Sequence, residues 1–524
     1  MAPLAGLSRA MGVAARPTLP RALSARWLIA VGLVLHLVLA MSVGLSPDEA
    51  HYALYGAHPD WSYFDHAPLV GWLQAPFVAA GGFDLFMRIV PMLSWLLATL
   101  LMIALCRRLP IESDSSPQSA TRHDGWVALM MLLTPLLNLL GVALVPDTLL
   151  IVLVPAAMSA VWRLRRPEAA QRMARWLPLA LLLGLCILSK YTGVFVVLGA
   201  LLTVLRFHAG RLLRLPGMWL CAAVVLACAG PILAWNMRHH WASIAYQLAH
   251  LSGGETWTAR SMLRAVALQA ALYGLLLPIA AVRGLRGRGR QSRDGWQDFA
   301  DLRAMVIAFA VPLLVVFAAL SGRGSSLPHW TACGWMAIVP LAVAGMATMR
   351  KGTLVALIFW QGGLLVAIVG LVLTGGPGAE SGGAAISGAG VRQPGAHPNP
   401  VTDVIGWEEA ALHGAGLAEQ RRARGLVVMN WSLASRLAWY ARPMPVFVAP
   451  EHQDQFRLWF GPLQTGDSAV VVDWSSMPLK IPLGPDGFSS CRPVSQLPIV
   501  FGGRQLAHFN YLYCEGWRIG GLSR

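Results

Sequence analysis

The sequence predicts an all-α polytopic membrane domain followed by a small C-terminal α/β domain outside the membrane. Of the 524 residues, 56% are hydrophobic and only 13% are charged, which is about half of the roughly 25% found in a typical soluble domain. Apolar runs of about 20 residues, the length that crosses a hydrocarbon core, recur along the chain. After residue 400 the composition changes, and short apolar runs typical of buried strands replace the long ones.

Eleven apolar segments are predicted to cross the membrane. Residues 1–26 precede them and carry four arginines. We expect the first segment to remain as an uncleaved span, because it is long and no small-residue cleavage site follows it in a suitable place. The predicted segments are 27–44, 84–106, 126–145, 148–162, 176–189, 191–206, 217–235, 262–282, 303–321, 330–349 and 352–374.

The net charge of +16 follows from the membrane topology rather than from nucleic-acid binding. The basic residues are nearly all arginines in short loops between apolar segments. With eleven spans, all of the arginine clusters fall on one side, which the positive-inside rule makes the cytoplasm. We therefore expect a multi-pass protein of the bacterial inner (plasma) membrane, with a cytoplasmic N-terminal segment (1–26) and everything after residue 374 in the periplasm.

The chain after the last span divides into a linker and a domain. Residues 375–400 are rich in Gly, Ala and Pro and predict a flexible linker. Residues 401–524 predict a small periplasmic α/β domain, with strands at "GLVVMN", "MPVFVAP" and "SAVVVDW" and an amphipathic helix at "WSLASRLAWYA". Cys491 and Cys514 fall in this exported domain, where a disulfide is permitted. Sequence spacing alone does not establish that they meet.

No nucleotide or metal cofactor is predicted. The sequence contains no CxxC, HExxH or P-loop motif and no GxGxxG motif preceded by a strand. A zinc site built from His51, His66 and a carboxylate would match no standard ligand spacing. The ligand spacing therefore gives no support for a divalent cation, and the missing motifs disfavour a soluble nucleotide-dependent enzyme.

The first external loop, residues 45–83, is unusually polar for so apolar a chain. Helical spacing predicts two interfacial helices along the membrane surface. Asp48 and Glu49 follow the first span directly, and each has two interpretations. Asp48 is equally suited to cap the first interfacial helix or to act in catalysis. For Glu49, a cap or a supporting hydrogen bond is favoured over substrate contact.

Two further charged residues lie where the membrane makes charge costly. Asp147 follows Pro146 at the start of an almost uncharged span, so a functional role is favoured over a helix cap. Lys190, one of only three lysines, lies on the external side against the orientation rule. There it could bind a phosphate, which is slightly favoured, or extend to lipid headgroups. His240 and His329, also external, could bind phosphate or hold loop backbone.

The first loop, "SPDEAHYALYGAHPDWSYFDHAPLVGW", closely resembles that of bacterial membrane glycosyltransferases related to protein O-mannosyltransferases and to the lipid A aminoarabinose transferase. The resemblance continues through "VPDTLL", "GLCILSKYTGVF", "PILAWNMRHHWASIAYQL" and "LPHWTACGWMAIVPL", and covers most of residues 27–350. It implies the C-type glycosyltransferase (GT-C) fold for residues 27–374.

The resemblance assigns roles to individual residues. Asp48 corresponds to the catalytic acidic residue of the first loop, and Asp147 to a second acidic residue in the next external loop. Asp65 and His66 match an acidic–basic pair in the family segment that begins here at Tyr63, and all three residues are expected to bind substrate. Lys190 matches a basic residue that contacts donor phosphate. This chain departs from the pattern at Ala67, where the family has Pro, and in "LPHW", where many relatives have Asn before Trp.

The implied function is transfer of a sugar from a polyprenyl-phosphate-linked donor to an envelope acceptor on the periplasmic face. Asp48 would be the general base in an inverting reaction, and the acceptor could be lipid A, another glycan or a protein hydroxyl. The partners are then the donor, a lipid or glycan acceptor and the bilayer, without nucleic acid. The alternatives are a transporter or flippase for a lipid-linked or anionic substrate, and a non-catalytic envelope assembly protein.

Overall fold

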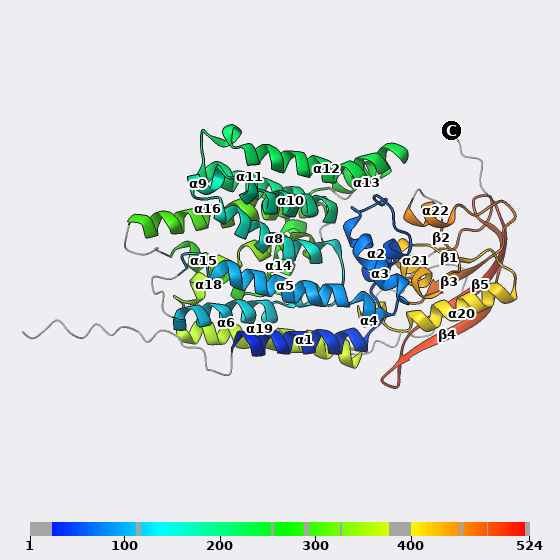
Figure 1. The fold of residues 1–524 in the computed structure, drawn as a ribbon. Helices are drawn as coiled ribbons and strands as arrows, with labels where there is room; N and C mark the ends of the chain where they lie inside the picture. The colour runs from blue at the N-terminus through cyan, green and yellow to red at the C-terminus, as the bar shows by residue number, and fades with distance from the viewer. Residues whose placement is uncertain are drawn as a thin grey trace, which may run out of the picture.

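The computed structural model describes residues 24–111, 117–252, 256–287, 293–324, 327–376, 400–449, 454–478 and 480–518. Its helices run side by side in a bundle, and a sheet domain formed by the C-terminal part of the chain lies against one end of that bundle (Figure 1). The predicted N-terminal segment and most of the predicted linker fall outside the described residues. The predicted all-α membrane domain with a small α/β domain is confirmed.

Among the described residues, six helical segments are long and apolar enough to cross a membrane. Each coincides with a predicted span, because a membrane-crossing helix is one of the few stable structures for an apolar run of 18 or more residues. These segments are α1 (Ala25–Ser42), Asp84–Cys106, which joins α4 (Asp84–Met87) to α5 (Ile89–Cys106), α8 (Pro146–Arg163), α12 (Pro216–Arg238), Trp296–Arg323 within α16 (Arg293–Leu320) and its 3-10 extension, and α19 (Lys351–Thr374).

Two predicted continuous spans, 262–282 and 330–349, are bent instead. The first is α14 (Ala259–Tyr273) followed by α15 (Leu276–Leu285), at 96° to each other, and the second bends by 59° before α18 (Val339–Met346). At the first bend Gly274 has φ +78°, and the side chain of Gln361 occupies the place of a Cβ. Gln361 accepts a hydrogen bond from Leu276 N at 3.1 Å. The bend is therefore specified by Gly274 and a buried amide that bonds the freed backbone.

The remaining predicted segments coincide with shorter apolar helices. Residues 126–145 form parts of α6 (Pro117–Leu133) and α7 (Pro135–Leu139), with a break before Pro135. Residues 176–189 and 191–206 form α10 (Leu177–Ser189) and α11 (Gly193–Phe207), which meet at a turn around Lys190. By length and composition the described residues contain six spans, or eight if each bent pair counts as one. The predicted number of eleven stays a prediction.

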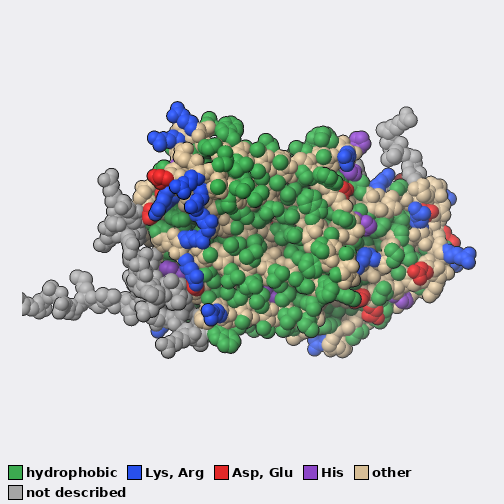
Figure 2. Space-filling view, in the orientation of Figure 1, with side chains coloured by type: hydrophobic (Ala, Val, Ile, Leu, Met, Phe, Trp, Pro, Cys, Tyr) green, Lys and Arg blue, Asp and Glu red, His purple; other side chains and the backbone are tan. Residues whose placement is uncertain are grey.

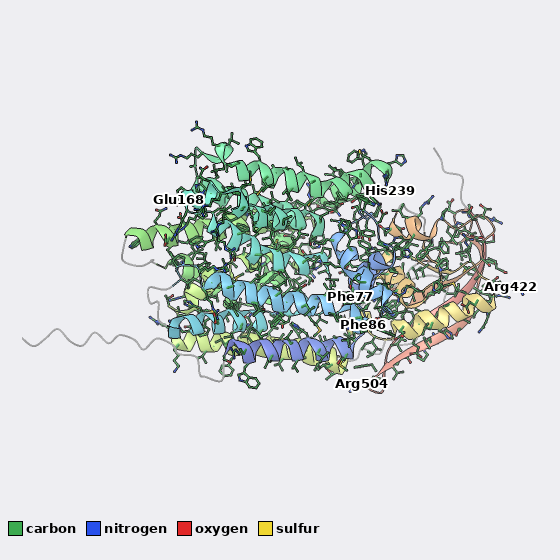
Figure 3. The ribbon with its side chains drawn as sticks, viewed as in Figure 1. Phe77, Phe86, Glu168, His239, Arg422 and Arg504 are labelled. Atoms are coloured by element: carbon green, nitrogen blue, oxygen red, sulfur yellow. A yellow bond between two sulfur atoms is a disulfide. The ribbon has the colours of Figure 1, made fainter. Side chains whose placement is uncertain are left out.

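The two ends of the bundle differ in charge. In Figure 2, Lys and Arg side chains gather at the end away from the sheet domain, while the side of the bundle is almost entirely hydrophobic. Figure 3 places Glu168, in one of the arginine-rich loops, at that basic end and His239 at the other. This distribution agrees with the prediction that the arginine loops share one side.

The C-terminal domain is a five-stranded mixed sheet in the order β2-β1-β3-β5-β4. The three predicted strands and the predicted helix are all present. A long β4–β5 hairpin was not predicted, because Pro493 and Pro498 interrupt β4; as an edge strand β4 tolerates them. The elements are α20 (Trp407–Gln420), β1 (Leu426–Val428), α21 (Trp431–Tyr440), β2 (Val446–Val448), α22 (Gln455–Phe460), β3 (Ala469–Trp474), β4 (Phe488–Phe501) and β5 (Arg504–Trp517).

A disulfide joins two strands within the C-terminal domain, and Tyr440 bonds this domain to the membrane domain. Cys491 and Cys514 face each other on β4 and β5 and form a disulfide, a pairing that the sequence permitted but did not establish. The hydroxyl of Tyr440 on α21 accepts a hydrogen bond from Leu45 N at 2.8 Å and donates one to Asp84 Oδ2 at 2.6 Å. The domain is therefore attached to both ends of the first external loop.

Candidate active site

The first external loop forms two short helices, α2 (Pro47–Ala57) and α3 (Leu69–Ala79), as predicted. A capping box starts α2: Ser46 Oγ accepts from Glu49 N, and Glu49 Oε2 accepts from Ser46 N at 2.9 Å. Pro47 occupies the first helical position. Asp48 comes next and is half-buried, and no hydrogen bond or ion pair joins its carboxylate to another described residue. The helix start thus presents a carboxylate that no capping contact uses.

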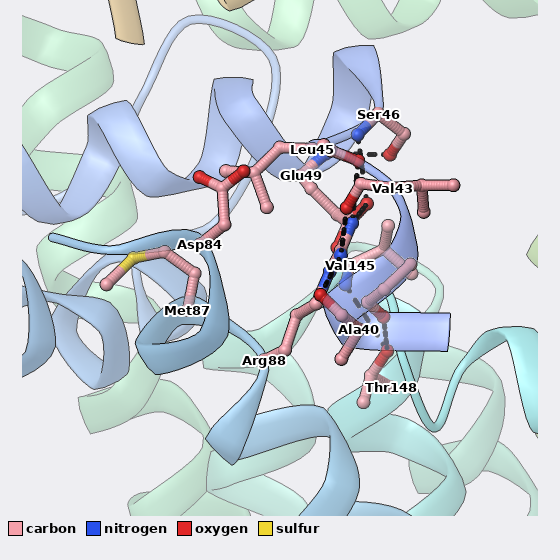
Figure 4. A network of polar contacts seen from close by, with 12 residues as sticks. Ala40, Val43, Leu45, Ser46, Glu49, Asp84, Met87, Arg88, Val145 and Thr148 are labelled. Carbon is pink, nitrogen blue, oxygen red and sulfur yellow. Dashed lines mark hydrogen bonds and ion pairs between the residues drawn. The ribbon is translucent and has the colours of Figure 1, made fainter. Parts of the chain in front are cut away.

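Glu49 has a different environment, although it is the next residue. Its carboxylate is buried and pairs with the buried guanidinium of Arg88, with Oε1 at 2.8 Å from Nε. Arg88 also donates to the carbonyls of Ala40, Val43 and Gly44 at 2.7–2.9 Å (Figure 4). This network joins the end of α1 to the start of α2. It agrees with the cap or supporting role for Glu49, and it leaves neither carboxylate oxygen facing a substrate.

Asp147 and Lys190 form a second buried ion pair. Asp147 is the second residue of α8 and is 1% exposed, and its Oδ2 lies 2.6 Å from Lys190 Nζ at the turn between α10 and α11. The Nε2 atom of His329 lies 3.8 Å from the same oxygen. The other oxygen, Oδ1, is buried and has no hydrogen-bond partner in the part of the chain that the structure describes. The predicted pair therefore exists, with unused bonding capacity on the carboxylate.

Asp65 is the centre of the third group. It accepts a hydrogen bond from the Tyr55 hydroxyl, and its Oδ2 lies 3.2 Å from His51 Nε2 and 3.5 Å from His66 Nδ1. Gln247 on α13 (Ala242–Ser252) bonds the Asp65 carbonyl at 2.6 Å and so fixes the loop. Burial alone would raise the pKa of Asp65, but the two imidazoles lower it well below its ordinary value. Asp65 is therefore ionised.

Tyr52 connects these groups. It lies one helical turn after Asp48, is 5% exposed, and its hydroxyl lies 3.1 Å from His66 Nε2. Burial raises the pKa of the Tyr52 hydroxyl well above its ordinary value, and three carboxylates raise it further. These carboxylates are Asp48, Asp65 and Asp147. The three acidic side chains predicted to act together thus all act electrostatically on one buried phenol.

His329 provides a second connection. Its imidazole interacts electrostatically with residues from four different segments, namely Asp48, His66, Asp147 and Lys190. The cluster therefore brings a half-buried carboxylate near a buried ammonium and two imidazoles. Such a set can take a proton from a hydroxyl and hold an anion, which are the two requirements of transfer from a phosphate leaving group.

Two of the predicted substrate-binding residues lie apart from this cluster. Tyr63 is fully buried; it stacks on Tyr55 at 3.6 Å between ring centroids and donates a hydrogen bond to the Tyr55 carbonyl at 2.9 Å. That geometry makes it a packing residue of the loop. His240 is exposed at the end of α12, with a backbone φ of +53°. No hydrogen bond or ion pair joins its side chain to a described residue.

Sequence reasoning missed three residues. Tyr52 could have been found, because a residue four positions after Asp48 lies on the same helix face. Arg88 could also have been found, as a charge at the external end of a predicted span. His51 was weighed only as a metal ligand. Among the described residues, no group of three or more His, Cys, Asp or Glu side chains is arranged to hold a metal ion.

Comparison with known proteins places the chain beside membrane glycosyltransferases. The family model of dolichyl-phosphate-mannose-protein mannosyltransferases matches residues 65–235, which include Asp65, His66, Asp147 and Lys190. A lipid A galacturonosyltransferase, RgtD of Rhizobium johnstonii, is 22% identical over 307 residues. That alignment covers 56% of this chain and 59% of the relative.

Two solved structures have the same fold over almost the whole chain. Both are of ArnT from Cupriavidus metallidurans, one bound to undecaprenyl phosphate and one in the apo state. The TM-scores are 0.58 and 0.57, with 14% and 16% identity, and each comparison covers 93% of this chain and 97% of the other. The apolar spans and these matches indicate an inner-membrane protein. They confirm the predicted resemblance to membrane glycosyltransferases of the aminoarabinose transferase type, with the GT-C fold.

Proposed function

We propose that this protein transfers a sugar from a polyprenyl-phosphate-linked donor to a lipid or glycan acceptor of the cell envelope. The observation that carries the proposal is the contrast within the cluster. Among the described residues no hydrogen bond or ion pair engages the Asp48 carboxylate, whereas the Lys190 ammonium is buried and held by Asp147. Sugar transfer from a phosphate needs a general base for the acceptor hydroxyl and, next to it, a cationic site for the departing phosphate.

Asp48 is the general base of the proposed reaction. It takes the proton of the acceptor hydroxyl as that oxygen attacks the anomeric carbon of the donor sugar. The bond between this carbon and the phosphate oxygen breaks, and polyprenyl phosphate leaves with the bonding electrons. Direct displacement inverts the anomeric centre.

The phosphate is bound by the cationic side of the cluster. Lys190 donates one hydrogen bond to Asp147 among the described residues, and an ammonium has three donors. Two donors are therefore available to a phosphate. His66 and His329 lie at the edge of the cluster, each with a side chain 18–20% exposed, and can add further donors. Asp147 holds Lys190 in place, and its free Oδ1 can accept a donor from the substrate.

The names of the matched proteins suggest a class of acceptor and a class of lipid carrier. The matched relative is named for lipid A, and one matched structure is named for bound undecaprenyl phosphate. We therefore propose lipid A as the first acceptor to test and undecaprenyl phosphate as the carrier. The proposed orientation puts residues 1–26 in the cytoplasm and residues 401–524 in the periplasm, because the arginine loops lie at the end away from the sheet domain.

A transporter or flippase is the alternative. Such a protein would place its ionisable groups near the bilayer midplane, on broken helices in corresponding halves. Here Asp48 follows α1 directly, Asp147 begins α8 and Lys190 lies in a turn between helices. All three are at helix ends on the side of the sheet domain, which favours a surface reaction over passage through the membrane.

The test is transfer by the purified protein in lipid nanodiscs. Radiolabelled pentose and hexose donors on undecaprenyl phosphate are incubated with lipid A, and both labelled lipid A and released undecaprenyl phosphate are measured. We expect transfer by the wild type and a loss of at least about 1,000-fold in Asp48→Asn. Asp124→Asn, which removes a carboxylate paired with Arg107, is the control and should keep full transfer. Ordinary turnover by Asp48→Asn would refute the role of Asp48.

A further inference from the structure

A pocket at the basic end of the bundle is lined by three arginines and by apolar side chains. It has a volume of about 580 Å³ and lies between α15 and the start of α19. Figure 1 shows α15 and α18 toward the end away from the sheet domain, where the Lys and Arg side chains of Figure 2 gather. The pocket is therefore separate from the candidate active site. The lining residues are Pro278, Ile279, Val282, Arg283, Arg286, Met349, Arg350 and Thr353.

Close packing of two short helices positions the arginines. A Cβ on Gly284 of α15 would lie 1.9 Å from a carbonyl oxygen of α18, and a Cβ on Gly345 of α18 would lie 1.8 Å from one of α15. Glycine at both positions lets the two backbones approach. Arg283 Nη2 also donates a hydrogen bond to the Thr348 carbonyl at 3.5 Å. The arginines of α15 are thus held next to the turn between α18 and α19, which contributes Arg350.

The three pocket arginines differ from other arginines at the same end in their charge partners. Arg107 pairs with Asp124, and Arg165 and Arg206 pair with carboxylates of α16. In the part of the chain that the structure describes, no carboxylate lies within ion-pair distance of the pocket arginines. The charge-orientation rule explains why arginines lie at this end, but not why three from two segments share one pocket. The pocket is therefore a positive site without an acidic partner among these residues.

Apolar side chains adjoin this positive site and indicate that its ligand is a lipid. Ile279 and Val282 are 39% and 48% exposed, on the same helix as two of the arginines. On α19, only Leu354 and Gln361 are buried against other described residues, so acyl chains can lie along that helix. A free phosphate would contact the guanidinium groups alone, whereas a phospholipid contacts both kinds of surface. Basic pockets between spans on the cytoplasmic side of membrane proteins bind anionic lipid headgroups.

We propose that this pocket binds an anionic phospholipid of the leaflet at the basic end. Arg286 and Arg350 bond the lipid phosphate, which a guanidinium can do with two parallel donors. Ile279 and Val282 pack against the acyl chains. The bound lipid connects α15 with the start of α19 and so stabilises this junction. The site does not depend on the proposed sugar transfer and is tested without turnover.

Native mass spectrometry of the full-length protein in detergent tests the proposal. Phosphatidylglycerol and phosphatidylethanolamine with the same acyl chains are titrated separately, and the bound fraction of each is measured. We expect phosphatidylglycerol to bind at least about fivefold more tightly. In Arg286→Gln/Arg350→Gln its binding should weaken about 25-fold, at about fivefold for each arginine. Equal binding of phosphatidylglycerol by the wild type and this variant would overturn the proposal.

A matched control removes the same charge outside the pocket. Arg166 and Arg172 are exposed beside α9 (Pro167–Ala170), at the same end. Arg166→Gln/Arg172→Gln should therefore keep binding within about twofold of the wild type. Equal weakening by the two double variants would mean a general attraction of lipid to the basic end, and would overturn the pocket. If the pocket double variant does not fold, Arg350→Gln alone should weaken binding about fivefold, and no loss in it would refute the site.

Two further arms distinguish a lipid from free phosphate. A large excess of inorganic phosphate should leave phosphatidylglycerol bound, because the acyl chains add apolar contact that phosphate lacks. Ile279→Asn/Val282→Asn keeps all three arginines and should weaken lipid binding about fivefold. Displacement of the lipid by phosphate, or unchanged lipid binding in this variant, would mean a simple anion site and overturn the lipid assignment.

Discussion

Two buried ion pairs lie on the same side of the membrane domain and differ in how completely they are bonded. Arg88–Glu49 and Lys190–Asp147 are similar in distance, 2.8 and 2.6 Å, and in exposure, with no side chain above 8%. In the first pair, all five donors of the guanidinium are used, by the carboxylate and by three backbone carbonyls. In the second, one carboxylate oxygen has no partner among the residues that the structure describes.

This difference separates a structural pair from a binding pair. A buried polar atom without a partner is costly, and such atoms are retained where a ligand completes them. The saturated Arg88–Glu49 network closes the junction between α1 and α2 and has nothing left to offer a substrate. The Asp147–Lys190 pair has bonds left for one. Two pairs with the same kinds of charge therefore have different functions, and mutation can tell them apart.

The largest effect is expected for stability at Arg88. Arg88→Met leaves a buried carboxylate and three carbonyls unbonded, and should lower the free energy of unfolding by about 3–5 kcal/mol. The double variant Glu49→Leu/Arg88→Met should not recover, because the carbonyls and Ser46 N still lack partners. Thermal unfolding in detergent measures both.

The control for this prediction is an exposed pair. Arg107 bonds Asp124 at 2.5 Å, but its side chain is 57% exposed, so Arg107→Met should cost less than about 1 kcal/mol. Full recovery in the double variant at Arg88 would mean that its backbone bonds contribute little, and would remove the distinction drawn between the two pairs.

The second prediction concerns the unsaturated pair. Asp147→Leu/Lys190→Met replaces both charges by apolar groups, which is often neutral for stability. We expect unfolding within about 1 kcal/mol of the wild type, together with a loss of transfer of about 100-fold, because one cation for the phosphate is gone. A double variant that is stable and still transfers sugar would show that this pair is structural, like the other.

Much of the cluster could be predicted from the sequence, because the membrane topology already determines which loops lie on the same side. Loops on the same side of a bundle meet, so Asp48, Asp65 and Asp147 could be expected to approach one another once the arginines had set the sides. Lys190 could be found because lysine is rare in this chain and this one violates the charge rule.

The contacts that assign roles could not be predicted. Glu49 and Arg88 are 39 residues apart, and Leu45 and Tyr440 are 395 apart. Hydrophobic patterns specify which face of a helix is buried but not which distant polar group it meets. The bend at Gly274 depends likewise on Gln361, 87 positions later in the numbering, on another helix. Local sequence patterns predicted the helices and strands, whereas polar contacts between residues far apart in the sequence determine the roles of individual side chains.

A third and smaller effect is expected from pH at Asp65. Its pKa is below the ordinary value in the folded state, so ionised Asp65 stabilises the protein above its unfolded-state pKa, and this stabilisation is lost as the pH falls through the folded-state pKa. Asp65→Asn should therefore cost about 2 kcal/mol at about pH 5–7, and this cost should shrink below about pH 4. Unfolding of both proteins across this range tests it. A cost that disappears already near pH 6 would contradict the ionised assignment.

The smallest effect is expected where the two domains meet. Tyr440 donates to Asp84 and accepts from Leu45 N, so Tyr440→Phe removes two bonds but keeps the ring packing. We expect a loss of about 1 kcal/mol in unfolding free energy, and no change for Tyr513→Phe, whose ring packs against Arg421 and Arg492. Transfer by folded Tyr440→Phe should remain near that of the wild type, because neither bond involves a residue of the cluster. A large loss of transfer at unchanged stability would instead mean that the contact between the two domains sets the geometry of the donor site.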